Sequence, residues 1–450
     1  MLLSAVLESV DTDGDRYEVR LAGPGQITTL TPELLTLSGT TGGSRVFLSV
    51  TEVNGDGQVD IGQLSTGGAT INSVSIQGDL GGLNVGRLNR LDAVSLGRGG
   101  NATGVFIIAG PLGRANVPGG IDDANITISG DAGVLQFGDR RDPASRVSNT
   151  SISIGGDANR IRIGQSFTAE SSLDVLGSVN RLDVDQWIVN SDIDVVGDVN
   201  KLSVRGGIRQ DSTITVGGDL VRFQARKSVT DLTLTVDGLL GQGQFLTDLR
   251  DSTLVLTAVE KLQVRDDLDE TSISVTDDLV SLQADDSRGL TLRVSGTLGM
   301  LQVRRDLEEA LVSSLNGIER VQVRQDLVRC TLVAGIDIGP DLTLDVAPGG
   351  DDVEWGDVRI QDVSVGGDFI DSSVSAGVSP RGLWFGDGDD SPTADDQGTS
   401  RIERMIVRGD VASSGLPGES YAITASDGVD FIRAGRSVFT GAPGVALQEF

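Results

Sequence analysis

An all-β fold, in which short strands wind into a parallel β-solenoid, is the fold class that this sequence predicts. A ten-residue pattern, L-x-x-L-x-V-[R/G]-x-[D/S]-L, returns at intervals of about 20 residues through the middle of the chain. A second pattern, [S/T]-x-[I/L]-x-V, lies between its copies. Both patterns alternate apolar and polar residues, as half-buried strands do, and no useful length of sequence has a helical period.

Each repeat supplies several short strands and no helix. The clearest copies of the first pattern are Val199–Ile208, Leu220–Val229, Val259–Leu268, Leu298–Leu307 and Ile318–Leu327. The second pattern reads STITV, STLVL and TSISV at 212–216, 252–256 and 271–275. Gly-Asp or Asp-Asp pairs separate the two patterns, where the backbone must turn. A single coil cannot bury its apolar face alone, whereas stacked coils share one continuous core.

The repeat divides the chain into a cap, a solenoid and a tail. Residues 1–70 lack the repeat and read as antiparallel hairpins, so we expect a small N-terminal β cap over the open edge of the first coil. We expect the solenoid at 71–440, with insertions near 337–356 and 377–401 that leave it as loops, and a tail at 441–450. The alternative is a set of β-sandwiches. Their strands would be spaced less regularly along the sequence, and their cores would need more aromatic residues than the 4% that this chain contains.

Two resemblances refine this prediction. The coil length resembles that of right-handed parallel β-helices, and the strict six-residue period of left-handed ones is absent. The opening MLLSA is similar to the end of the LEPR-x-L-L-S-A signature, which begins many large secreted bacterial proteins. This resemblance implies an extracellular or cell-surface protein. It also implies that Met1 occupies the x position and that the first part is missing, through truncation or a misassigned start, which makes the chain a candidate fragment of a longer one. No apolar run approaches the ~20 residues of a membrane span, so we expect none.

The composition excludes several kinds of chemistry. The chain has no His and a single Cys, Cys330, so it can form neither a His-based triad, nor a zinc site that uses His, nor an internal disulfide. Its 36 basic and 65 acidic residues give a net charge of −29. Such a surface repels phosphate backbones, so we expect no nucleic-acid partner, and it favours cations.

Asp-rich turns are the candidate sites for Ca²⁺, the one cofactor that the sequence suggests. The segment EVNGDGQVDIGQ at 52–63 resembles a dockerin or EF-hand loop, although Gln63 replaces the usual bidentate acid at its twelfth position. Its candidate ligands are Glu52, Asn54, Asp56 and Asp60. DTDGD at 11–15 has carboxylates at alternate positions. The acidic insertion at 386–396 offers Asp387, Asp389 and Asp390. The alternative for each is a plain solvated turn.

Arginines recur at the seventh position of the first pattern. Three of them, Arg265, Arg304 and Arg324, form a candidate ligand strip, and each is followed two residues later by an Asp. Stacked arginines repel one another unless carboxylates lie between them. One interpretation is therefore a surface ladder of ion pairs, and the other is a strip that binds an anionic polysaccharide.

The sequence favours a non-catalytic structural or adhesive role, with cell-wall or matrix polysaccharide or surface proteins as partners. The alternative is a polysaccharide lyase or glycoside hydrolase of the pectin-lyase-like β-helix type, which needs clustered Asp residues beside a loop-built cleft. Its catalytic candidates would be Asp352, Asp387 and Asp389, which lie near Trp355 and Trp384 at the two insertions.

Overall fold

The computed structural model describes residues 4–11, 13–97, 104–344, 353–354, 356–379, 391–393, 399–413, 421–439 and 442–448. The fold is all-β, with about 13 turns of a parallel β-solenoid and coils of about 20 residues, which confirms the predicted fold class. The chain divides into two compact units, Met1–Leu220 and Val221–Phe450, and this division falls inside the repeats. In the described part of the chain, no helix is long and apolar enough to cross a membrane.

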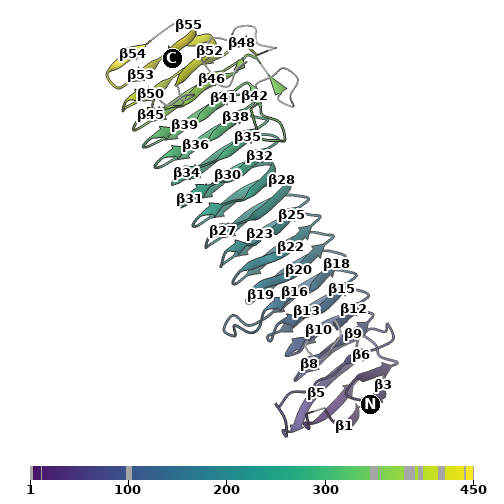
Figure 1. Cartoon of the computed structure of the whole chain (residues 1–450). Coiled ribbons are helices and arrows are strands. Elements are labelled where there is room, and N and C mark those ends of the chain that lie inside the picture. The colour runs from purple at the N-terminus through teal and green to yellow at the C-terminus, as the bar shows by residue number, and fades with distance from the viewer. Residues whose placement is uncertain are drawn as a thin grey trace. The chain divides into compact units, whose positions relative to one another are not determined.

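The first unit opens with antiparallel strands, drawn in purple in Figure 1. β1 (Ser4–Val10) pairs with β2 (Arg16–Ala22), β2 pairs with β5 (Arg45–Glu52), and β3 (Gln26–Leu30) pairs with β4 (Leu34–Ser38). Parallel pairing begins where β5 meets β7 (Ile71–Ile76) and where β4 meets β6 (Gln63–Ser65). The antiparallel strands therefore lead directly into the parallel coils.

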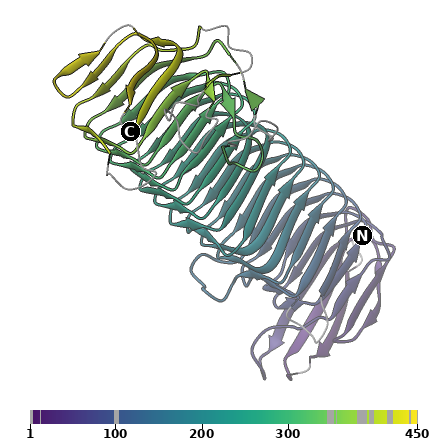
Figure 2. The ribbon, with the colours of Figure 1, turned by 45° about the horizontal axis from the view of Figure 1, so that its top comes forward.

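Successive coils stack on one another within each unit (Figure 2). Their parallel register defines three stacks of strands, which we call sheets A, B and C. In the first unit, sheet A includes β19 (Ala158–Ile163), β21 (Val179–Val184) and β23 (Val199–Val204). Sheet B includes the starts of β20 (Phe167–Val175) and β22 (Ile188–Val195), and sheet C includes their ends. The second unit repeats this order of strands, so the same names apply within it.

Parallel register places equivalent apolar residues of successive coils in line. Ile161, Leu182 and Leu202 are register partners in sheet A, and each is at most 1% exposed. In the second unit, the buried rings of Phe223 and Phe245 meet edge to face, with 5.3 Å between their centroids. The alternation of the sequence patterns thus becomes a continuous core inside each unit.

The turn between sheets B and C accounts for the recurrent Asp-Ser phrase. Asp251 and Asp371 have φ of 48° and 47°, in the left-handed region that Asp tolerates better than most residues do. The next residue is a buried Ser. Ser252 Oγ donates to the Arg250 carbonyl and Ser372 Oγ to the Ile370 carbonyl, both at 2.7 Å. The hydroxyl therefore adds a local hydrogen bond to a carbonyl that also accepts a main-chain N–H from the preceding coil.

Cys330 occupies this same turn position in its own coil. Its Sγ donates to the Val328 carbonyl at 3.2 Å, and the side chain is 1% exposed. Burial raises the pKa of the thiol to about 12. The single cysteine is thus an inert substitute for the turn hydroxyl.

Carboxylates form a hydrogen-bonded ladder at the turn between sheets A and B of the second unit. Oδ1 of Asp306 accepts from the backbone N–H of Asp326 at 2.8 Å, and Oδ1 of Asp326 accepts from that of Asp368 at 2.7 Å. Asp368 continues the ladder to the backbone of Asp410 at 2.8 Å. The Asp residues that punctuate the pattern therefore bind the next coil through its main chain.

Each predicted insertion contains a short antiparallel pair. β42 (Ile336–Asp337) pairs with β43 (Val353–Glu354), and β47 (Val378–Ser379) pairs with β48 (Ser391–Pro392). Within the predicted tail, β55 (Ala442–Gln448) pairs antiparallel with β52 (Ala422–Val429). An unpredicted loop at 138–146 leaves the first unit. Gln165 Nε2 holds it by donating to the carbonyls of Asp139 and Arg140 at 3.1 and 2.8 Å.

Candidate functional site

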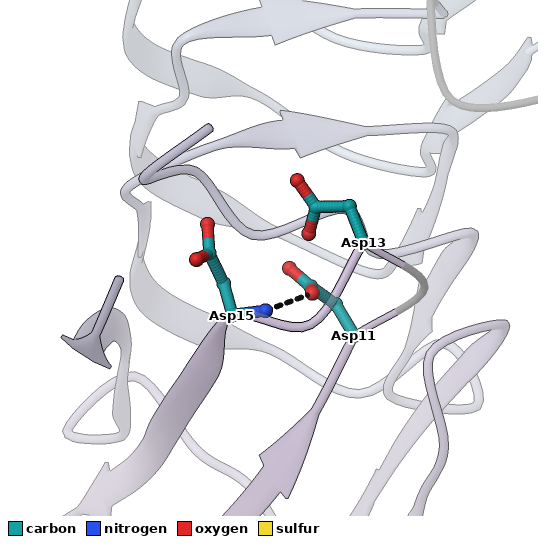
Figure 3. Close-up of side chains that lie close together, drawn as sticks. All are labelled: Asp11, Asp13 and Asp15. Carbon is teal, nitrogen blue, oxygen red and sulfur yellow. Dashed lines mark hydrogen bonds between the residues drawn. The ribbon is translucent and has the colours of Figure 1, made fainter. Parts of the chain in front are cut away.

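Three carboxylates meet in the turn that joins β1 to β2 (Figure 3). Asp11, Asp13 and Asp15 each place an oxygen within 4.8 Å of the others, and among the described residues this is the group that could hold a metal ion. Asp11 and Asp15 are buried, whereas Asp13 is exposed. The cluster thus has one side that solvent can reach.

The turn itself brings these side chains together. Oδ1 of Asp11 accepts from the backbone N–H groups of Gly14 at 3.1 Å and Asp15 at 2.7 Å, and Figure 3 shows the second bond. Gly14 has φ of +103°, which other residues rarely adopt. The backbone of the D-x-D-G-D turn therefore folds back and donates hydrogen bonds to the first carboxylate of the turn.

A second loop, at 54–57, holds the cluster from the other side. Oδ1 of Asp15 accepts from the N–H groups of Asn54 and Gly55, and its Oδ2 accepts from that of Gly57, all at 2.6 Å. The N–H of Asp56 donates to Oδ2 of Asp13 at 3.0 Å. A Cβ at position 55 would lie 2.1 Å from that same oxygen, so a larger residue there would displace the Asp13 carboxylate.

The carboxylates in and around the cluster differ in the direction in which their pKa values are shifted. The backbone N–H of Gly55, followed by other loop amides, lowers the pKa of Asp15. Burial, followed by a hydrogen bond with Asp13, raises the pKa of Asp11, and this bond lowers the pKa of Asp13. Partial burial, followed by repulsion from nearby carboxylates, raises the pKa of Asp60 to about 6.

This arrangement suits a hard cation. Its donor atoms are all oxygens, the type of ligand that Ca²⁺ prefers, and neighbouring carboxylates repel one another unless a positive charge lies among them. Asp11, Asp13 and Asp15 are the residues that would hold the ion, and the amides of the 54–57 loop fix two of them.

The ligands predicted from the 52–63 segment surround this cluster rather than form it. Glu52 lies 3.7 Å from Arg16 in an exposed ion pair, and Asn54 contributes its backbone N–H. Oδ1 of Asp56 accepts from the N–H of Gln58 at 2.9 Å, and Asp60 is close enough to be affected by the charges of Asp11 and Asp13. The sequence shows both Asp-rich segments, but they become one site only through the pairing of Arg16 with Glu52 in β2 and β5.

The predicted sites at the insertions lie outside the described residues. These residues are Asp352, Asp387, Asp389 and Asp390, together with Trp355 and Trp384.

The arginines of the predicted ligand strip are exposed, and each directly follows a strand of sheet A in the second unit. These strands are β30 (Thr253–Val264), β36 (Leu298–Val303) and β39 (Ile318–Val323). Among the described residues, no ion pair joins Arg265, Arg304 or Arg324 to a carboxylate. In the first unit, by contrast, Arg205 Nε lies 3.2 Å from Asp185 Oδ1.

The carboxylates expected to neutralise the strip have other partners. Asp267 pairs with Arg250 at 2.9 Å and with Arg305 at 3.3 Å. Asp306 and Asp326 belong to the backbone ladder between coils. The structure therefore differs from the simple ladder of ion pairs, because these Asp side chains bond elsewhere.

Comparison of the chain with protein-family models, curated proteins and solved structures finds no match. The functional argument therefore depends on the geometry of these sites.

Proposed function

We propose that this chain is a non-catalytic structural or adhesive β-solenoid that works outside the cell or at its surface. The observation that carries the proposal is the register of the coils, which sets equivalent outward side chains in line. For example, Gln302 Nε2 donates to Oε1 of Gln322, its register partner in the next coil, at 3.2 Å. A surface that repeats from coil to coil can meet a polymer at many points, and such multivalent contact strengthens weak individual contacts.

Calcium belongs to this proposal as a structural ion. An ion held by Asp11, Asp13 and Asp15 would join the first turn to the 54–57 loop, whose amides already bind two of these carboxylates. It would thereby stabilise the antiparallel strands that precede the parallel coils, since anything that binds only the folded state stabilises it.

Retention without reaction is the expected behaviour on polysaccharides. The protein is incubated with insoluble acidic and neutral polysaccharides, with Ca²⁺ or with a chelator, and both pelleted protein and new reducing or unsaturated ends are measured in the same tubes. We expect saturable retention on at least one polymer and no new ends. New ends would contradict the proposal and favour a lyase or hydrolase, and retention on no polymer would contradict the adhesive role.

Calcium binding should weaken as the pH falls below about 6, where Asp60 takes up a proton. Without Ca²⁺, the folded state disfavours the ionised form of Asp60. Protonation of this group therefore adds stability as the pH falls from above 6 toward 3.8, which is the ordinary pKa of an Asp side chain. With Ca²⁺, the ionised form is favoured, so binding competes with protons. The increase in melting temperature on adding Ca²⁺ should therefore be larger at pH 7 than at pH 5.

The matched control for this prediction is Asp60→Asn, which removes the titrating group. We expect the variant to show a smaller pH dependence of the Ca²⁺-induced shift. An equal shift at both pH values in the unaltered protein, or no shift at pH 7, would contradict the assignment of the site.

A further inference from the structure

The outward face of sheet A in the second unit is regular over four consecutive coils. Its strands are the end of β30, then β33 (Leu279–Ala284), β36 and β39, labelled in part in Figure 1. The register partners Leu262, Leu282 and Leu301 point into the core and are 0% exposed. Because side chains alternate along a strand, the residues beside them form columns on the outer face.

A column of glutamines lies along the middle of this face. Its members are Gln263, Gln283, Gln302 and Gln322, which are register partners from coil to coil and are half-buried. One flanking column contains Lys261, Ser281, Met300 and Arg320 and is cationic at its two ends, and the other contains Arg265, Asp285, Arg304 and Arg324. The face thus joins amide groups, which can donate and accept hydrogen bonds, to cationic groups on both sides.

These columns are positively charged although the chain as a whole has a net charge of −29. They hold five cationic side chains, Lys261, Arg265, Arg304, Arg320 and Arg324, and one carboxylate, that of Asp285. Arg305 Nε lies 3.0 Å from Asp285 and neutralises the charge of that carboxylate. Asp362 lies 3.6 Å from Arg320 and neutralises the charge of that guanidinium. The exposed acids Glu260, Asp266 and Glu319 lie at the borders of the face.

In the part of the chain that the structure describes, no carboxylate pairs with Arg265, Arg304 or Arg324, because the Asp residues that follow them bond elsewhere. Asp306 and Asp326 accept main-chain N–H groups of the next coil, and these bonds hold the carboxylates in the ladder. An exposed guanidinium with no carboxylate partner can bind a carboxylate or sulfate with two parallel hydrogen bonds.

We propose that this face binds an anionic linear polysaccharide along the stack of coils. The inference rests on the proposed adhesive function and names its ligand class. Successive coils repeat at about 4.8 Å, so a polymer that carries carboxylate or sulfate groups meets arginines at several points. The glutamine column offers hydrogen bonds to its hydroxyl groups. Complementary charge supplies the attraction, which salt screens.

The test compares two variants with the same change in net charge. The strip variant is R265Q/R304Q/R324Q. The control variant, R45Q/R87Q/R114Q, alters arginines of the first unit that are exposed and have no ion pair among the described residues. The probes are polygalacturonate for carboxylate, dextran sulfate for sulfate, and neutral dextran. Retention is measured by affinity electrophoresis at two salt concentrations, and reducing and unsaturated ends are assayed in parallel.

We expect the unaltered protein and the control variant to bind at least one acidic polymer and not dextran. The affinity of the strip variant should fall by about tenfold or more. Each 1.4 kcal/mol of binding free energy lost is a factor of ten. Equal binding by the strip variant, an equal loss in the control, or equal binding to dextran would overturn this inference and leave the adhesive function standing. New polymer ends would instead overturn the proposed function.

Discussion

Replacing Phe245 with Ala is expected to lower the free energy of unfolding by about 3–5 kcal/mol. The ring is 0% exposed and meets that of Phe223 edge to face at 5.3 Å, so its removal loses both burial and an aromatic contact. Parallel register places Val264 beside it in the next coil, and a close-packed core has little freedom to close the cavity. Urea denaturation followed by circular dichroism measures the loss.

Val255→Ala is the control for this substitution, because Val255 is 41% exposed on sheet C of the same unit. We expect its effect to stay within about 0.5 kcal/mol. An equal loss in both variants, or a negligible loss in Phe245→Ala, would contradict the continuous core.

Replacing Asp15 with Ala should release the 54–57 loop and abolish the stabilisation by Ca²⁺. Three main-chain N–H groups bond to this one carboxylate at 2.6 Å, and Ala offers them no acceptor. Hydrogen exchange at the amides of Asn54, Gly55 and Gly57 should become about tenfold faster or more, because their protection depends on that acceptor. Exchange followed by NMR or mass spectrometry gives the rates, and thermal unfolding with and without Ca²⁺ gives the second effect.

Glu8→Ala removes one exposed carboxylate from the same hairpin and serves as the control. It should leave both the exchange rates and the Ca²⁺ effect nearly unchanged. Retained Ca²⁺ stabilisation in Asp15→Ala would show that the ion binds elsewhere, and unchanged exchange would contradict the role of the carboxylate in holding the loop.

The solenoid could be predicted because parallel stacking imposes a period that the sequence must repeat. Each coil needs inward residues such as Leu262 and Leu282 at equivalent positions, and these residues produce the visible pattern. The role of Asp326 could not be predicted in the same way. An Asp two residues after an Arg fits an ion pair and a turn equally well, and only the backbone of the next coil decides between them.

The candidate metal site shows a similar limit. The segments at 11–15 and 54–57 each suggest a cation loop, but the bond from Asn54 N–H to Asp15 joins residues 39 positions apart. That contact depends on the antiparallel pairing of β2 with β5. The alternation of apolar and polar residues predicts the two strands, but it does not predict that they pair with each other. Cys330 is a further example, since nothing local shows that it replaces a turn serine.

The most direct test of the central claim is the length of a polymer after it has been bound and released. A defined acidic polysaccharide that the protein retains is eluted with high salt, and its size distribution is compared with that of untreated polymer by size-exclusion chromatography. A structural or adhesive solenoid returns the polymer with its length unchanged, however long the contact. Shortened chains that accumulate with time and protein concentration would contradict the claim and identify the protein as an enzyme.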